Sequence, residues 1–149
     1  MGVKEVSVNR KAFHDYIIEE RIEAGISLLG TELKSIRKGK VQLKDSFISF
    51  SNNEAFIKGM NIAKCETAGN YFQHDEERER KLLLHKHEII QLASKVKVQG
   101  YTVIPLKLYI KDGLVKLEIA LAKGKTLYDK RSDDKIKSME REARKAMKR

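Results

Sequence analysis

The chain of 149 residues has little of what marks secreted or membrane-spanning proteins. Cys65 is its single cysteine, so an internal disulfide is impossible and a reducing cytoplasm is the expected compartment. No apolar run approaches the roughly 20 residues of a membrane-spanning helix, and we expect no signal peptide ahead of the first strand. A single proline and the absence of tryptophan exclude nothing further.

Motifs of the common enzyme classes are missing as well. The sequence contains no P-loop, no Gly-x-Ser-x-Gly turn and no dinucleotide-binding fingerprint. His85 and His87 could ligate a metal, but residues at i and i+2 near a helix start are expected to point apart. Lys86 between them would also repel a cation. We therefore expect no enzyme, no catalytic residue, no cofactor and no metal site.

Positive charge is concentrated at the C-terminal end. The chain carries 31 Lys/Arg against 21 Asp/Glu, a net charge of +10, and residues 123–149 alone carry 11 against 5, which is +6 of that total. Residues 1–122 keep 20 basic and 16 acidic groups and enough apolar residues for one ordinary core. We predict a folded domain over 1–122 and a basic tail over 123–149, with a phosphate-rich partner.

Apolar residues alternate with polar ones from Tyr16 to Leu28, which predicts one long half-buried strand. Gly25 is predicted to mark a bend or a bulge in it. The predicted inward face comprises Tyr16, Ile18, Ile22, Ala24, Ile26 and Leu28.

Two hairpins are predicted from turn residues and apolar pairing. The first joins 45–51 to 54–60 through Asn52-Asn53, which tolerate positive φ, and the second closes through Asp112-Gly113. A two-residue loop in the second would align four apolar pairs on one face, with Pro105 on the other face at an edge or barrel rim. These pairs are Ile110–Val115, Leu108–Leu117, Leu106–Ile119 and Ile104–Leu121.

Short helices flank these strands. The first helix is predicted to have Thr31 as its N-cap and to end before Gly39. The second is predicted over about 86–98 and ends before Gly100. Residues 63–79 are predicted to form a surface loop. With at least five mostly antiparallel strands, the predicted fold class is mainly β, a small OB-fold-like barrel flanked by helices. Helically spaced apolar residues from Ile136 to Met147 predict a tail that is disordered when free and helical when bound.

Basic clusters recur along the chain beside aromatic side chains, a combination that RNA-binding surfaces use for phosphate contacts and base stacking. One cluster alone is typical of a solvated surface, but together they favour an RNA-binding protein. The clusters are Asn9-Arg10-Lys11; Lys34, Arg37, Lys38 and Lys40; Arg78, Arg80 and Lys81; and Lys123, Lys125, Lys130 and Arg131, with Tyr16, Tyr71, Phe72 and Tyr128 as the aromatic candidates.

Three other functions stay open from composition and pattern. A single-strand RNA binder of the cold-shock type should show uninterrupted aromatic rows on its strands, which this chain does not have. A membrane-surface module would need bulky anchors such as Trp or Phe in its tail. A nuclease would cut RNA in a metal-dependent way.

Longer motifs carry a specific likeness across almost the whole chain. In order they are Asn9-Arg10-Lys11-Ala12, Tyr16, Glu23-Ala24-Gly25, Gly30-Thr31-Glu32-Leu33-Lys34-Ser35-Ile36-Arg37, Gly39-Lys40, Arg80-Lys81-Leu82-Leu83-Leu84-His85-Lys86, Gly100-Tyr101-Thr102-Val103-Ile104-Pro105-Leu106, Ala122-Lys123-Gly124-Lys125 and Asp129-Lys130-Arg131. By these motifs the sequence resembles the SsrA-binding protein family, SmpB.

The resemblance implies a bacterial ribosome-rescue factor with an OB-fold-like barrel. Such a protein binds the tRNA-like domain of transfer-messenger RNA (tmRNA) and delivers it to stalled ribosomes for trans-translation. Its C-terminal tail enters the vacant mRNA channel of the small subunit at the decoding centre. The further expected partner is alanyl-tmRNA with elongation factor Tu, and the protein is expected to be a cytoplasmic monomer without a membrane partner.

The resemblance also assigns roles by position, with Asn9, Glu23 and Leu83 matching positions that hold tmRNA. Since a carboxylate cannot pair with a phosphate, Glu23 is expected to accept from a sugar hydroxyl or a base amine. The expected RNA-binding residues are Asn9, Arg10, Lys11, Tyr16, Glu23, Lys34, Arg37, Leu83 and Lys123. The expected ribosome-binding residues of the tail are Gly124, Lys125, Tyr128, Asp129, Lys130, Arg131 and Met147.

Overall fold

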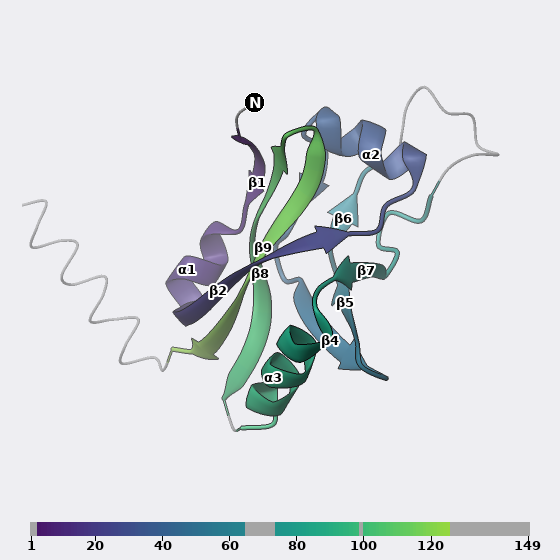
Figure 1. Ribbon diagram of the computed structural model, residues 1–149. Helices are drawn as coiled ribbons and strands as arrows, with labels where there is room; N and C mark the ends of the chain where they lie inside the picture. The colour runs from purple at the N-terminus through teal and green to yellow at the C-terminus, as the bar shows by residue number, and fades with distance from the viewer. Residues whose placement is uncertain (1–2, 65–73, 99, 126–149) are drawn as a thin grey trace, which may run out of the picture.

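The computed structural model describes residues 3–64, 74–98 and 100–125 (Figure 1). Its elements in chain order are β1 (Val3–Val8), α1 (Arg10–Asp15), β2 (Tyr16–Ile26), α2 (Gly30–Arg37), β3 (Val41–Gln42), β4 (Phe47–Ser51), β5 (Glu54–Lys58), β6 (Asn61–Ile62), β7 (Arg80–Leu83), α3 (Lys86–Val96), β8 (Tyr101–Lys111) and β9 (Leu114–Gly124). The predicted fold class, mainly β with short helices, is confirmed. None of the helices in these ranges is long and apolar enough to cross a membrane. Cys65, Tyr71, Phe72 and the predicted tail helix lie outside the described residues.

Seven strands form one antiparallel sheet in the order β1-β8-β9-β2-β7-β5-β4, and β3 pairs with β6 in a second, two-stranded sheet. The large sheet curls so that β4, at one edge, packs near β8 without a hydrogen-bonded ladder between them. Helix α3 packs across β5 and β8 and contributes Ile89 and Leu92 to the main core. The result is a partly open antiparallel barrel with helices on its outside (Figure 1).

Apolar side chains gather in two clusters, one on each face of the central strands. The main core fills the inside of the curl and includes Leu117, Ile119 and Leu121 of β9. On the outer face, Ala12 of α1 packs in a second cluster with Ala120 of β9. Strand β9 is therefore buried on both faces where α1 covers it. The remaining members of the second cluster are Tyr16, Ile18, Ile104, Leu106 and Ala122.

The bulge in β2 lies six residues before the predicted position. The pairing of β2 with β9 skips Glu19, which is the extra residue, whereas Gly25 is regularly paired on both sides. An extra residue reverses the alternation of side chains between the two faces. Tyr16 and Ile18 therefore contact the outer cluster while Ala24 lies in the main core. The single inward face that we predicted for this strand is wrong.

Both predicted hairpins form through the predicted loops. Asn52, Asn53 and Asp112 have φ values of 50°, 60° and 52°, which is the left-handed conformation that these short polar side chains tolerate. In the first hairpin the predicted register is confirmed, with Ile48 opposite Ile57.

The register of the second hairpin is confirmed only near its turn. Pairing follows the prediction as far as Leu108 and Leu117, and then a bulge at Leu106 shifts it by one residue. Ile119 consequently pairs with Pro105, and the predicted pairs Leu106–Ile119 and Ile104–Leu121 are wrong. Pro105 lies in an interior strand, where the adjacent irregularity accommodates a residue that lacks an N–H.

Helix α2 begins two residues earlier than predicted, because Glu32 rather than Thr31 organises its first turn. The Leu29 N–H donates to Glu32 Oε1 at 2.8 Å, so the N-cap is Leu29. The Thr31 hydroxyl is instead 2.8 Å from Nδ1 of His74, a buried histidine in the predicted surface loop. Gly39 follows the helix with a φ of 76°, as predicted for its C-terminal end.

A buried ion pair joins α2 to β7. Arg80 Nε donates to Glu32 Oε2 at 2.5 Å, and both side chains have no exposed area. Arg78 Nη2 donates to Glu32 Oε1 at 2.6 Å, and Arg80 Nη1 donates to the Met60 carbonyl at 2.7 Å. The prediction that Arg80 belongs to a surface basic cluster is therefore wrong, because its guanidinium is buried and paired with Glu32.

Glu32 is the least replaceable member of this network. Burial alone would raise the pKa of Glu32, but the hydrogen bonds from Arg78, the Leu29 N–H and Arg80 outweigh burial and hold that pKa below its usual range. The stability that Glu32 contributes is therefore present above its unfolded-state pKa and is lost as the pH falls through its folded-state pKa.

Replacing Glu32 with Gln should lower the free energy of unfolding by about 3 kcal/mol, because the Arg80 charge would stay buried without a counterion. Glu54→Gln is the matched control. It removes an exposed ion pair of 3.5 Å with Lys81 and should change stability by less than about 1 kcal/mol. Urea unfolding at neutral pH measures both values, and equal losses for the two variants would contradict the buried-pair argument.

Candidate nucleic-acid interface

The outer face of strands β8, β9, β2 and β7 presents a row of residues that are neighbours across the sheet. Strand pairing defines the row as Tyr109, Lys116, Gly25 and Leu83. The residues that precede or follow them along each strand point the other way, into the main core, and include Leu108, Leu117, Ala24 and Leu82. The row therefore lies on the outside of the curled sheet, where Leu83 is exposed and Tyr109 is nearly buried.

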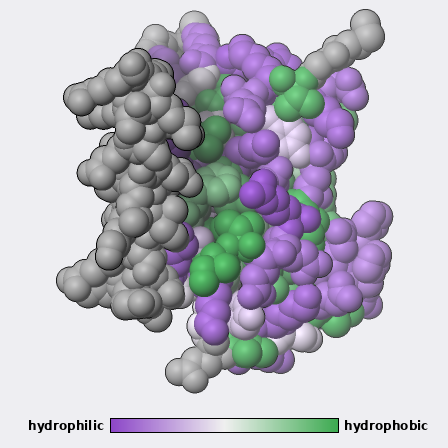
Figure 2. Space-filling model, turned by 90° about the vertical axis from the view of Figure 1, so that its left-hand side faces the viewer, coloured by the Kyte–Doolittle hydropathy of each residue, from purple (hydrophilic) through white to green (hydrophobic). Residues whose placement is uncertain are grey.

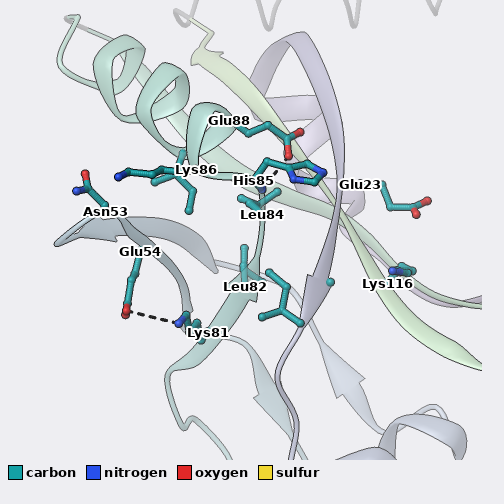
Figure 3. Close-up of a pocket in the computed structure, with 13 residues that line it drawn as sticks. Glu23, Asn53, Glu54, Lys81, Leu82, Leu84, His85, Lys86, Glu88 and Lys116 are labelled. Atoms are coloured by element: carbon teal, nitrogen blue, oxygen red, sulfur yellow. Dashed lines mark hydrogen bonds and ion pairs between the residues drawn. The ribbon is translucent and has the colours of Figure 1, made fainter.

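A groove of about 630 Å³ lies at the β7 end of this row. Figure 3 shows it between β7 and the start of α3, with Glu23 and Lys116 on one side and Asn53 and Glu54 on the other. Leu83 lines the groove and keeps 57% of its surface exposed. The structure thus brings together Glu23 and Leu83, two of the residues expected to bind RNA, although they are 60 positions apart in the sequence.

Gly25 lines this groove and lets Leu83 lie close to β2. A Cβ atom placed on Gly25 would lie 3.1 Å from the Leu83 Cβ, closer than side chains normally pack. Because Gly25 is paired with both Lys116 and Leu83, neither neighbouring strand can move away to make room. The glycine therefore allows Leu83 to approach β2, a requirement different from the bend that we predicted.

The carboxylate of Glu23 is held by groups from β8. The Tyr109 hydroxyl donates to Glu23 Oε2 at 2.5 Å, and Lys111 Nζ lies 3.6 Å from the same oxygen. The hydrogen bond from Tyr109 is the main cause that lowers the pKa of Glu23, and the nearby charges of Lys111 and Lys116 act in the same direction. Glu23 is therefore a charged acceptor at neutral pH, with its side chain 41% exposed.

Two histidines lie at the start of α3, and the first of them, His85, lines the groove. The rings of His85 and His87 stack with their centroids 5.6 Å apart and their planes at 11°, so the prediction that they point apart is wrong. The reason is that His85 is the N-cap and has extended backbone, with its N–H donating to Glu88. The Glu three positions after His85 is the sequence signal that could have revealed this cap. No metal-ligand cluster occurs among the residues that the structure describes.

Helix α1 forms a second region, in which Asn9 is structural. The Asn9 side chain is 6% exposed, and its amide nitrogen donates to the Pro105 carbonyl at 2.9 Å. Its side-chain oxygen accepts from the Ala12 N–H at the first turn of α1. The structure therefore places Asn9 beneath the surface, where it holds α1 over the bulge at Leu106, while Arg10 beside it is exposed.

The predicted start of the tail lies beside the same helix. Tyr16 pairs with Gly124, and the Lys125 N–H donates to the Asp15 carbonyl at 2.8 Å (Figure 1). Lys123 Nζ lies 5.8 Å from the centroid of the Tyr101 ring. These contacts join residues 123–125, the first of the predicted tail, to α1 and β2.

The face that carries α1 is mixed in character. Figure 2 shows apolar side chains in the middle of the visible body surface, with hydrophilic ones to their right and below them. Phe13 and Ile17 are large apolar residues of α1 and β2 that keep 40% and 44% of their surface exposed. The Arg21 guanidinium lies 5.7 Å from the centre of the Phe13 ring. This region offers rings and cations together.

The remaining predicted residues fall elsewhere or outside the described ranges. Lys34 and Arg37 are exposed on α2, apart from the groove residues. Lys11 is exposed but forms an ion pair of 3.0 Å with Asp45. The predicted tail residues Tyr128, Asp129, Lys130, Arg131 and Met147 lie outside the described residues. The nine predicted RNA-binding residues therefore occupy three areas, namely the groove, the α1 end and α2.

Sequence comparisons agree over nearly the full length. A sequence model of the SmpB protein family matches residues 6–149. An SsrA-binding protein of Caldicellulosiruptor bescii is 57% identical over 146 residues, which cover 98% of this chain and 92% of that protein. An SsrA-binding protein of Nitratiruptor sp. is 55% identical over 147 residues, which cover 98% of each chain.

A solved structure agrees with the fold as well. A chain in the structure described as "tmRNA-SmpB: a journey to the center of the bacterial ribosome" superposes with a TM-score of 0.68. The two chains are 45% identical, and the superposition covers 84% of this chain and 91% of that one. Because sequence and fold match over most of their length, the chain belongs to the SmpB family.

Proposed function

We propose that this chain binds the tRNA-like domain of tmRNA and delivers it to stalled ribosomes for trans-translation. The observation that carries this proposal is the groove in which Glu23, Leu83 and Lys116 meet, in a chain of the SmpB family. The related solved structure, whose description names tmRNA, SmpB and the ribosome, supports the same partners.

The chemistry of the groove suits a folded RNA better than a free anion. Leu83 offers an exposed apolar surface to a base or ribose, and the ring of His85, which stacks on His87, offers a flat one. Lys116 can contact a phosphate, whereas Glu23 can accept from a 2′-hydroxyl or a base amine. A mixture of one acceptor, one cation and apolar patches recognises the shape of an RNA rather than its charge alone.

The tail serves the second half of the proposed function. Gly124 at the α1 end follows Lys116 in the groove by eight positions along β9, a distance of about 27 Å in an antiparallel strand. A groove for tmRNA and a basic tail for the mRNA channel can therefore act at the same time. Gly124 and Lys125 would direct the tail away from the body, and Tyr128 to Arg131 and Met147 would contact the ribosome.

We further infer that the chain acts by binding alone. The groove residues Glu23, Leu83 and Lys116 are groups that can hold RNA, and the curated relatives are named SsrA-binding proteins. Cytoplasmic localisation, a monomeric state and cooperation with alanyl-tmRNA bound to elongation factor Tu belong to the same proposal.

Replacing Leu83 with Asp should weaken tmRNA binding by at least about tenfold, since it removes an apolar contact and brings a carboxylate toward phosphates. Leu114→Asp is the matched control, because Leu114 is equally exposed, at 61%, but lies at the turn between β8 and β9. Gel-shift titration of the tRNA-like domain at fixed salt measures both affinities. Equal affinities for the two variants would contradict the placement of RNA in the groove.

Deleting the residues after Tyr128 should leave tmRNA binding within about twofold of the full chain and abolish peptide tagging of stalled products. The reason is that the groove lies in the body, whereas the tail is the part proposed to enter the mRNA channel. Gel-shift affinity and an in vitro tagging assay measure the two activities separately. A parallel loss of both activities would refute this division between body and tail.

A further inference from the structure

Tyr109 is a nearly buried tyrosine on the outer face of the sheet. It lies on β8, two strands away from β2, and its side chain is only 5% exposed. Its hydroxyl donates to Glu23 at 2.5 Å, across β9. Nothing in the sequence singled it out, because the contact joins positions 86 residues apart.

The two contacts that hold Glu23 leave one of its oxygens available. Tyr109 donates to Oε2, and the Lys111 ammonium also lies nearest to Oε2, at 3.6 Å. The other oxygen, Oε1, has no hydrogen-bond partner among the described residues. Glu23 lines the groove with 41% of its side chain exposed, so this oxygen can accept from a ligand.

We propose that Tyr109 is a positioning residue that fixes the Glu23 carboxylate in one orientation and so presents Oε1 to a ribose hydroxyl or base amino group of the bound RNA. This inference rests on the proposed function. An unrestrained glutamate would lose rotamer freedom on binding, and a side chain that is already fixed avoids most of that loss.

The charge state of Glu23 adds a second effect. The hydrogen bond from Tyr109 lowers the pKa of Glu23, while burial first and Glu23 second raise the pKa of Tyr109. At neutral pH the phenol is thus a neutral donor and the carboxylate an ionised acceptor. The other charged or titratable groups near Glu23 are Lys111 on β8, Lys116 and Glu118 on β9, and His85 in the groove.

The central variant is Tyr109→Phe, which keeps the ring and removes only the hydroxyl. It should weaken binding of the tRNA-like domain by up to about tenfold, because the freed Glu23 side chain would have to be ordered when the RNA binds. Tyr101→Phe is the matched control, because the Tyr101 hydroxyl likewise donates to a carboxylate, Glu19, at 3.1 Å, but outside the groove. Its affinity should stay within about twofold of the unaltered chain.

A double-mutant cycle separates positioning from a general effect on the fold. In a Glu23→Gln background the Tyr109→Phe change should add little further loss, because its effect passes through the carboxylate. Thermal unfolding of all variants records any change in stability. An equal loss with and without Glu23 would show that Tyr109 acts on the fold rather than on Glu23, and would overturn the inference.

The pH dependence gives an independent readout. Because the phenol lowers the pKa of Glu23, Tyr109→Phe should raise that pKa and move the loss of binding in acid to higher pH. Carbon NMR of the Glu23 carboxyl measures the shift directly in the full-length protein, including any variant that binds RNA poorly. An unchanged Glu23 titration would also overturn the inference.

The two proposals fail in different ways. If the unaltered chain does not bind the tRNA-like domain, the proposed function fails. If the unaltered chain binds, Glu23→Gln weakens binding and Tyr109→Phe does not, the proposed function stands and only the role of Tyr109 is lost. Weaker binding by Tyr109→Phe only when Glu23 is present, together with a raised Glu23 pKa, supports both.

Discussion

The burial of β9 on both faces is the constraint on which the rest of the structure depends. Its inward side chains fill the main core, while Ala120 and Ala122 lie under α1 on the outside. A shift of one residue would exchange these sets and place large side chains where only alanines fit. The register of β9 is therefore fixed, and with it the positions of the groove at one end of the strand and of Gly124 at the other.

The other half of the barrel is held by charge rather than by apolar packing alone. Glu32 and Arg80 attach α2 to β7, and β7 then carries Leu83 to the edge of β2. An ion pair without exposed area demands fixed geometry, since each charge has no alternative partner in water. The buried Glu32–Arg80 pair thereby helps to fix the position of the exposed Leu83 in the groove, although neither charged side chain is exposed.

Turns and fold class were predictable from the sequence because they depend on local chemistry. Asn52-Asn53 and Asp112-Gly113 identify their loops by the backbone conformations that they tolerate. The bulges at Glu19 and Leu106 were not predictable, because the alternation of apolar residues looks regular until a second core under α1 is known. The burial of Arg80 and Asn9 and the stacking of His85 escaped prediction because their partners are distant in sequence or depend on cap geometry.

The backbone hydrogen bond between Lys125 and Asp15 fixes the point at which the last 24 residues are attached to the body. A chain of that length spans at most about 80 Å when fully extended. Capture of a large partner by the body would confine the basic extension to that radius and raise its effective concentration there. Once the body has bound the partner, binding of the extension to the same partner becomes nearly intramolecular. The basic residues of the extension can then bind even if their own affinity for the partner is low.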